Sequence, residues 1–260
     1  MDNLIVQKYG GSSLATLKQF DFVAKKVKNS LKNSNKIVIV VSAMGNTTDE
    51  LVELGESFLK DSKNIENLRD FDQLLSTGEI ISASLMSMSL RKNNVKAISL
   101  TGQKAGIFTD EFHGSARISS IDEKVILNEL KKRDVVIVAG FQGVNEKGDI
   151  TTLGRGGSDT SAVAISVALD AKECQIFTDV DGVYTTDPRI SKGAKKIDNI
   201  TTEEMLELSS QGSKVLQPRA VEFAGKYDVG IRVLSTFKDG TGTLISKDND
   251  EKMEKAIISG

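Results

Sequence analysis

Two glycine-rich segments of the chain contain the residue types that proteins use to bind phosphate groups. The first, residues 8–13 (KYGGSS), follows an apolar run and precedes a helical pattern. Its glycines allow the backbone to approach a ligand, the helix start offers free N–H groups, and Lys8 adds a positive charge. The order is not that of a Walker A loop, and the chain contains no G-x-G-x-x-G fingerprint. Taken alone, a pair of glycines after a strand is more often a structural turn.

The second segment, residues 154–159 (GRGGSD), places three glycines around Arg155 immediately before a predicted helix. This is again the arrangement of an anion-binding loop at a helix start. The structural alternatives are that Asp159 is an N-cap and that Arg155 is a surface charge. Two such loops in one chain are difficult to explain as turns alone. Together they favour a polyanion such as a nucleoside triphosphate as the ligand.

A third polar segment, residues 177–189, follows a predicted buried strand, and strand ends are where ligands lie in open α/β sheets. Asp179 and Asp181 have the chemistry to hold ribose hydroxyls or to lie near Mg²⁺, and Arg189 has the reach to contact phosphate. The alternative is a turn in which the Asp side chains cap their own backbone. Lys214, at the start of a later predicted helix, would by itself be a solvated lysine.

Strands and helices must position these loops, and their patterns alternate along the chain. Short runs rich in Val and Ile are typical of strands buried on both faces, and the amphipathic stretches between them are typical of helices. The predicted strands are Leu4–Val6, Ile37–Val41, Val95–Leu100, Val135–Ala139, Gln175–Phe177 and Ile231–Leu234. The predicted helices are 15–32, 46–60, 64–91, 121–133, 159–171, 202–209 and 213–226, with hairpins near 141–153 and 241–246. This alternation predicts an α/β fold, one domain with two lobes, built on an open, mostly parallel sheet covered on both faces.

Composition excludes several classes of protein. The chain has 260 residues, 39% hydrophobic and 27% charged, which is sufficient for a sizeable core, and its net charge of -2 argues against nucleic-acid binding. One cysteine and one histidine exclude an intrachain disulfide and any metal site that needs two of either residue. Cys174 is expected in the core, and nothing indicates that His113 acts as a base. No apolar run approaches the length of a membrane span and the first residues do not resemble a signal peptide, so we expect a cytoplasmic protein without membrane partners.

The motifs of the chain, taken in this order, resemble those of the aspartate kinases in the amino-acid kinase family, over essentially the whole length. The most specific are ITTLGRGGSDTSAVA at 150–164 and FTDVDGVYTTDPR at 177–189. The other matching segments are KYGGSS at 8–13, VVSAMGNTTDELVEL at 40–54, LLSTGE at 74–79, SLTGQKAGIFTD at 99–110, HGSARI at 113–118, GFQGV at 140–144 and GSKVLQPRA at 212–220.

The resemblance implies the amino-acid kinase fold, with residues 1–260 as a catalytic domain. Its amino-acid lobe would cover about 1–140 and its ATP lobe about 141–246, and 247–260 would begin a linker. It also implies transfer of the γ-phosphoryl group of ATP, with Mg²⁺, to the side-chain carboxylate of L-aspartate. The products would be ADP and 4-phospho-L-aspartate, in the first step of the biosynthesis of the aspartate-family amino acids, which include lysine, threonine and methionine.

The resemblance also implies a role for particular residues. Glu79 would hold the substrate ammonium group, Arg155 its α-carboxylate, and Asp159 would orient Lys8, which contacts the transferring phosphoryl group. The implied catalytic residues are Lys8 and Asp159, and the implied aspartate-binding residues are Ser42, Thr47, Glu79, Arg155 and Ser158. The implied ATP-binding residues are Lys8, Gly10, Gly11, Ser12, Thr178, Asp179, Tyr184, Arg189 and Lys214. The ligands of Mg²⁺ stay open.

The chemistry of this reaction agrees with the residue types. A carboxylate nucleophile has an ordinary pKa near 3.9 and is ionised at neutral pH, so no general base is required. The transition state instead needs positive charge and N–H dipoles around a strongly anionic group. Lysines, arginines and two glycine-rich loops supply both.

The resemblance also implies a C-terminal pair of regulatory ACT modules, which would begin where the given sequence ends. From the sequence we expect an isolated catalytic domain or a form without feedback control, and a homo-oligomer stays open.

Three other functions compete with aspartate kinase. Another kinase of the same fold, acting on acetylglutamate, glutamate, carbamate or uridylate, is the first. Glu79 argues against all of these substrates except glutamate, because the others have no ammonium group for it to hold. A binding module without catalysis would not need Lys8, Arg155 and Asp159 together. A scaffold is disfavoured, because the chain has no coiled-coil heptads.

Overall fold

The computed structural model describes residues 4–33, 36–59, 64–188, 190–191, 193–210 and 215–247. Arg189 and Lys214, both expected at the nucleotide, therefore lie outside the described residues.

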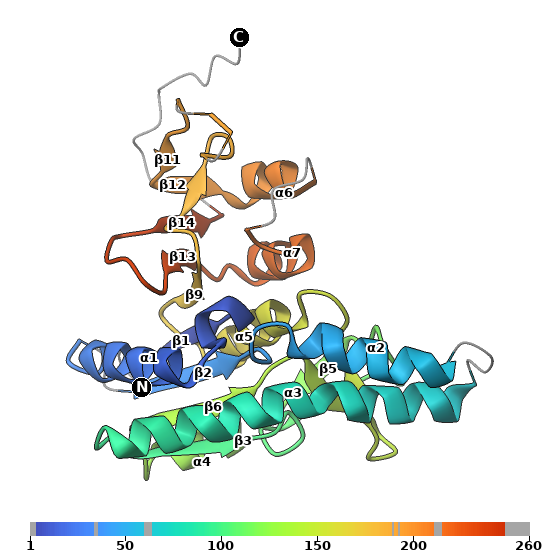
Figure 1. Cartoon of the computed structure of the whole chain (residues 1–260). Coiled ribbons are helices and arrows are strands. Elements are labelled where there is room, and N and C mark those ends of the chain that lie inside the picture. The colour runs from blue at the N-terminus through green and yellow to red at the C-terminus, as the bar shows by residue number, and fades with distance from the viewer. Residues whose placement is uncertain are drawn as a thin grey trace.

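An eight-stranded sheet runs through the molecule in the order β12-β14-β13-β9-β1-β2-β6-β3. Its strands, in chain order, are β1 (Leu4–Tyr9), β2 (Lys36–Val41), β3 (Ala97–Leu100), β6 (Val135–Ala139), β9 (Cys174–Thr178), β12 (Asn199–Thr201), β13 (Ile231–Ser235) and β14 (Thr243–Ser246). Every neighbouring pair is parallel except β13 and β14, which form the hairpin expected near the end of the chain. Figure 1 shows the strands following one another from β12 and β14 at the top to β3 at the bottom.

Helices cover both faces of the sheet, so the predicted α/β sandwich is confirmed. Successive side chains of β1, β2 and β6 point alternately to the two faces of the sheet, as strand geometry requires, and each face forms its own hydrophobic core. One face packs against α1 (Leu17–Ser30) and α3 (Ile65–Lys92), and α2 (Thr47–Leu59) lies along α3. The other packs against α4 (Glu123–Leu130), α5 (Gly157–Ala168), α6 (Thr202–Ser210) and α7 (Pro218–Tyr227).

The helix ends follow local chemistry. A capping box between Thr16 and Gln19 starts α1, and its apolar positions then recur on one face. The helix expected over 213–226 begins only at Pro218, where proline occupies the first turn of α7. The helix expected over 121–133 begins at Glu123, because Ile121 pairs in a strand.

A second sheet has four strands in the order β5-β4-β7-β8. The four strands are β4 (Ile107–Thr109), β5 (Ile118–Ile121), β7 (Gln142–Val144) and β8 (Ile150–Thr152). Strands β7 and β8 form the hairpin predicted near 141–153, whereas β4 and β5 were not expected. A two-stranded ribbon pairs β10 (Val183–Tyr184) with β11 (Lys196–Ile197). The small sheet joins residues on both sides of position 140, where the expected lobes would meet.

The order of the main sheet reverses at β1. Strands from residues 36–139 lie on one side of β1 and strands from residues 174–246 lie on the other. In Figure 1 the strands β2, β6 and β3 therefore lie below β1, and β9, β13, β14 and β12 lie above it. Open α/β sheets bind ligands at such a reversal, beyond the carboxyl ends of the strands.

Candidate active site

Lys8 lies near the end of the central strand and forms a largely buried ion pair. It shares a strand face with Val6, whose side chain packs into the core on the α5 side of the sheet, so Lys8 also points toward α5. Its Nζ lies 2.7 Å from Oδ1 of Asp159, and the two side chains are only 12% and 11% exposed. Asp159 lies in the first turn of α5, which follows Gly156 in the left-handed conformation with φ of 71°. The ion pair fixes the lysine ammonium group at the carboxyl end of the sheet.

The loops that follow β1 and β2 are in direct backbone contact. Gly10 donates from its N–H to the carbonyl of Phe177 on β9, and Gly45 donates to the carbonyl of Gly11. A Cβ atom on Gly11 would lie 2.9 Å from the carbonyl oxygens of both Ala43 and Gly45. Glycine is therefore required at Gly11 for the short 3-10 helix (Gly11–Leu14) to approach the second loop. Ser12 in this helix is exposed at the surface.

Glu79 is a buried carboxylate with one oxygen that has no partner. It lies on α3 and is 3% exposed, and its Oε1 accepts a hydrogen bond of 3.0 Å from the N–H of Ala43. Its Oε2 is buried and has no hydrogen-bond partner among the described residues. Burial raises the pKa of Glu79 from 4.5 to about 7. A buried carboxylate in this state is stabilised by any cation that reaches the free oxygen.

The hydroxyl residues expected around an amino acid lie on the elements next to Glu79 and Lys8. Thr47 begins α2 and its methyl group is 3.7 Å from the position of a Cβ on Gly78, the residue before Glu79. Ser42 follows β2 and donates from its N–H to the carbonyl of Tyr9. Ser158 precedes Asp159 on α5 and is 7% exposed. The structure thus brings these hydroxyl residues to the ends of β1 and β2 and the start of α5.

Arg155 lies at the surface between two glycines in the left-handed conformation. Gly154 has φ of 74° and Gly156 has φ of 71°. Within the part of the chain that the structure describes, the Arg155 guanidinium forms no ion pair or hydrogen bond. Its charge is therefore free to meet an anionic group.

The described residues expected at the nucleotide lie beyond β9. Thr178 ends β9 and donates from its hydroxyl to Oδ1 of Asp179 at 3.0 Å. The hydroxyl of Tyr184 on β10 donates to Asp181 at 2.9 Å, and this bond keeps the pKa of Asp181 below its ordinary value. The structure therefore places Thr178 and Asp179 beside β1, and Tyr184 in the ribbon that follows.

A cavity of about 490 Å³ opens elsewhere, on the α1 side of β9 and β13. Its lining includes Lys26, Phe177 and Lys238 but none of the expected site residues. We therefore place the candidate site by the strand ends and the unpartnered charges rather than by this cavity.

One buried cluster, centred on Asp72, was not identified from the sequence. Asp72 on α3 is fully buried, and its carboxylate accepts hydrogen bonds from the N–H of Gly114 and the hydroxyl of Thr152, and contacts Nδ1 of His113 at 2.8 Å. No local signal marks Asp72, because all its partners are distant in sequence. The motif beginning at His113 was noted only as part of the family resemblance.

The described residues form neither a candidate metal site nor a membrane-spanning helix. Among the described residues no three His, Cys, Asp or Glu side chains gather so that they could hold a metal ion. None of the helices in the described ranges is both long and apolar enough to cross a membrane.

The fold and the site define an α/β protein with two glycine-rich loops and a lysine–carboxylate pair at a reversal of strand order. A model of the amino acid kinase family matches residues 3–235. The chain belongs to the amino acid kinase family.

Several similar proteins with curated descriptions are aspartate kinases. An aspartate kinase of Pseudomonas fluorescens (strain SBW25) is 53% identical over 257 residues, covering 99% of this chain and 62% of that protein. Aspartokinase 2 of Bacillus subtilis (strain 168) is 47% identical, covering 98% of this chain and 61% of that protein. The chain therefore spans about three fifths of the length of these relatives.

Solved structures agree with the observed fold. The crystal structure of Escherichia coli aspartokinase III in complex with aspartate and ADP is 29% identical, with a TM-score of 0.82, covering 95% of this chain and 65% of that one. A carbamate kinase from Giardia lamblia, 17% identical with a TM-score of 0.70, shares the fold and covers 95% of this chain and 99% of that one.

Proposed function

We propose that the chain is an aspartate kinase domain, which transfers the γ-phosphoryl group of ATP to the side-chain carboxylate of L-aspartate. The products would be ADP and 4-phospho-L-aspartate, which begins the biosynthesis of the aspartate-family amino acids. The relatives described as aspartate kinases support this proposal, as does a similar structure that contains aspartate and ADP.

The observation that carries the proposal is the free oxygen of Glu79. A carboxylate that is 3% exposed and has one unpartnered oxygen needs a cation to be stable when charged. The ammonium group of an amino acid supplies that cation and can also donate to the nearby hydroxyl groups. Acetylglutamate, carbamate and uridylate have no such group, so Glu79 favours a free amino acid over the substrates of these other kinases.

Lys8 and Asp159 are suited to the transfer step. An oxygen of the aspartate side-chain carboxylate forms a bond to the γ-phosphorus, and the bond from that phosphorus to the β–γ bridging oxygen breaks as ADP leaves. No proton moves in this step. Lys8 neutralises the charge of the transferring group, and its ion pair with Asp159 fixes its ammonium group before the substrates bind. The backbone N–H groups at the start of the short 3-10 helix (Gly11–Leu14) would add further positive dipoles.

The remaining residues would bind the two substrates. Arg155, which has no partner in the described chain, would pair with the α-carboxylate of aspartate, and Ser42, Thr47 and Ser158 would surround the amino acid. Thr178, Asp179 and Tyr184 would bind ATP, together with Ser12 and with Arg189 and Lys214 outside the described residues. Mg²⁺ would enter with ATP, since this ion commonly binds phosphates and water with only one or two carboxylates.

We propose that the amino-acid lobe covers residues to about 140 and that the ATP lobe covers about 141–246. A few residues would reach across to the other substrate: Arg155 and Ser158 to the amino acid, and Lys8, Gly10, Gly11 and Ser12 to ATP. This division agrees with the position of Glu79 on α3, which packs on β2, β3 and β6, and with that of Thr178 at the end of β9. A reaction that consumes ATP for amino-acid biosynthesis would place the protein in the cytoplasm.

A hydroxylamine trapping assay tests the reaction, because an acyl phosphate reacts with hydroxylamine to give a coloured hydroxamate with Fe³⁺. The chain is supplied with Mg–ATP and L-aspartate, L-glutamate or N-acetyl-L-glutamate. We expect hydroxamate from L-aspartate alone, with the rate lowered at least about 100-fold by Lys8→Ala. Hydroxamate from another acid would show that the chain is a kinase with a different substrate. An unchanged rate in Lys8→Ala would show that Lys8 takes no part in the transfer step.

A further inference from the structure

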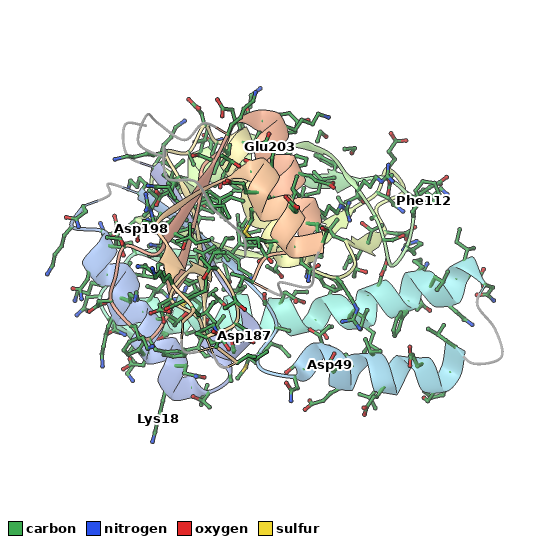
Figure 2. All side chains as sticks on the ribbon, turned by 90° about the horizontal axis from the view of Figure 1, so that it is seen from above. Lys18, Asp49, Phe112, Asp187, Asp198 and Glu203 are labelled. Carbon is green, nitrogen blue, oxygen red and sulfur yellow. The ribbon has the colours of Figure 1, made fainter. Side chains whose placement is uncertain are left out.

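Asp72 joins three segments of the chain through one buried carboxylate. The residue lies on α3 with a fully buried side chain. Its Oδ1 accepts from the hydroxyl of Thr152 on β8, and the N–H of Gly114 donates to both of its oxygens at 3.0 Å. Nδ1 of His113 lies 2.8 Å from Oδ2. In Figure 2 Phe112, immediately before His113, lies at the right of the view, the side that the end of α2 and the start of α3 also reach.

Two of these partners, Gly114 and Thr152, are close to the loop that carries Arg155. The carbonyl oxygen of Gly114 would lie 3.1 Å from a Cβ on Gly154, so the two glycines are in contact. The N–H of Ala116 donates to the carbonyl of Thr152 at 2.9 Å, which ties the same two segments together a second time. A short series of contacts therefore leads from Asp72 through Gly114 and Thr152 to Gly154 and Arg155.

The same helix carries Glu79. Asp72 and Glu79 are seven residues apart, which is about two turns, so both point from one face of α3. The helix rises about 1.5 Å per residue and keeps the two carboxylates about 10 Å apart along its axis. One rigid element thus carries the proposed ammonium-binding group and also the anchor of the loop that carries the arginine.

We propose that Asp72 is a positioning residue that sets the place of Arg155 relative to Glu79. It acts through Gly114 and Thr152 and, being fully buried, does not touch the substrate. The substrate class that this spacing selects is a short amino acid with one carboxylate for Arg155 and one ammonium group for Glu79. This inference rests on the proposed function for its kinetic consequence but not for its structural one.

The kinetic test uses Asp72→Asn, which keeps the shape of the side chain but replaces an acceptor oxygen with a donor. Asp70→Asn is the matched control, because Asp70 lies on the same helix with a side chain 66% exposed. For Asp72→Asn we expect the KM of L-aspartate to rise at least about 10-fold, because buried hydrogen bonds are lost, while the KM of Mg–ATP changes less than about twofold. The preference for L-aspartate over L-glutamate should also fall, whereas Asp70→Asn should change none of these values. An equal rise in both KM values, or an unchanged preference, would reduce Asp72 to a structural residue.

Hydrogen exchange tests the anchor without any turnover. In Asp72→Asn we expect the amides of residues 112–116 and 153–157 to exchange at least about 10-fold faster, with α1 and the main sheet unchanged. If Asp72→Asn does not fold, Thr152→Val can be used instead, because it removes one hydrogen-bond donor to Asp72. It should speed exchange in the same two segments by a smaller factor. Unchanged exchange in these two segments would overturn the proposal. Faster exchange in a chain that does not phosphorylate aspartate would retain the anchor and reject the proposed function.

Discussion

The two carboxylates near the end of β1 differ in how their charge is balanced. Asp159 is paired with Lys8 at 2.7 Å, so its charge is compensated within the chain. Glu79 is buried with one oxygen unpartnered, so its charge lacks compensation until a cation arrives. The first arrangement is complete without a substrate, and we propose that the ammonium group of the amino acid completes the second. This division gives each residue a distinct effect on activity.

The pKa of Glu79 leads to a prediction about pH. Burial raises this pKa to about 7, and the ammonium group binds only the ionised form. Below pH 7 protons compete with aspartate, so the KM of L-aspartate should rise about 10-fold between pH 8 and pH 6, while the KM of Mg–ATP stays nearly constant. Initial rates at saturating levels of the other substrate measure both values. A KM for aspartate that is flat over this range would contradict the assignment of Glu79.

Among single residues, the sequence predicted those whose chemistry is local or belongs to a motif. Lys8, Arg155 and Asp159 lie in glycine-rich segments, which made them candidates before any contact was known. Asp72 could not be found in this way, because its meaning depends on Gly114 and Thr152, which the fold brings to it from distant segments. The unpartnered oxygen of Glu79 is likewise visible only once α3 is packed.

At the scale of elements, close approach of two loops constrains the site. The short helix after β1 can contact the loop after β2 because Gly11 has no side chain. The same contact places the N–H groups that follow β1 next to the residues that follow β2. Parallel strands β1 and β2 thus present their loops at one edge of the sheet.

Gly11→Ala should separate these two loops. Its Cβ would lie 2.9 Å from two backbone oxygens, which cannot move without shifting the loop after β2. We expect a loss of about 1–3 kcal/mol in the free energy of unfolding and a higher KM for both substrates. Gly240→Ala is the control, because nothing lies within 4 Å of its Cβ position. Urea unfolding of both variants measures the effect, and equal stability would show that the loops are not in contact in solution.

The elements predicted well are those whose pattern is complete in itself. The strand at Val135–Ala139 was predicted at its observed bounds, since a continuous apolar run between polar segments marks a buried strand. The strands β4 and β5 were missed because they are only three and four residues long, and β5 has no buried residue. Pairing with distant partners, rather than local preference, makes them strands.

On the scale of the whole molecule, the strand order reverses at β1, and we propose that the two substrates meet at this reversal. Residues to 139 build one side of the sheet and residues from 174 build the other, and Lys8 lies between them. Sequence alternation predicted the α/β class and its helices on both faces. It could not predict which strands neighbour β1, because strand order depends on pairing between distant segments.

Ionisation of the buried Glu79 carboxylate should also lower the free energy of unfolding of the whole molecule. Because folding raises its pKa from 4.5 to about 7, this residue favours the folded state at low pH, and that contribution is lost as pH rises through 7. Glu79→Gln has no such loss. We therefore expect its stability relative to the unmutated protein to improve by about 1–3 kcal/mol between pH 5 and pH 8, with substrates absent. Urea unfolding at both pH values measures this, and parallel changes in the two proteins would contradict it.

We propose above all that Glu79 binds the ammonium group of an amino acid. Calorimetric titration in the presence of Mg–ADP, with L-aspartate and with succinate, tests it most directly, because succinate is aspartate without the amino group. We predict that the unmutated protein binds L-aspartate at least about 30-fold more tightly than succinate, and that Glu79→Gln removes most of this difference. Equal binding of the two ligands, or a preference that survives in Glu79→Gln, would show that Glu79 does not bind the ammonium group.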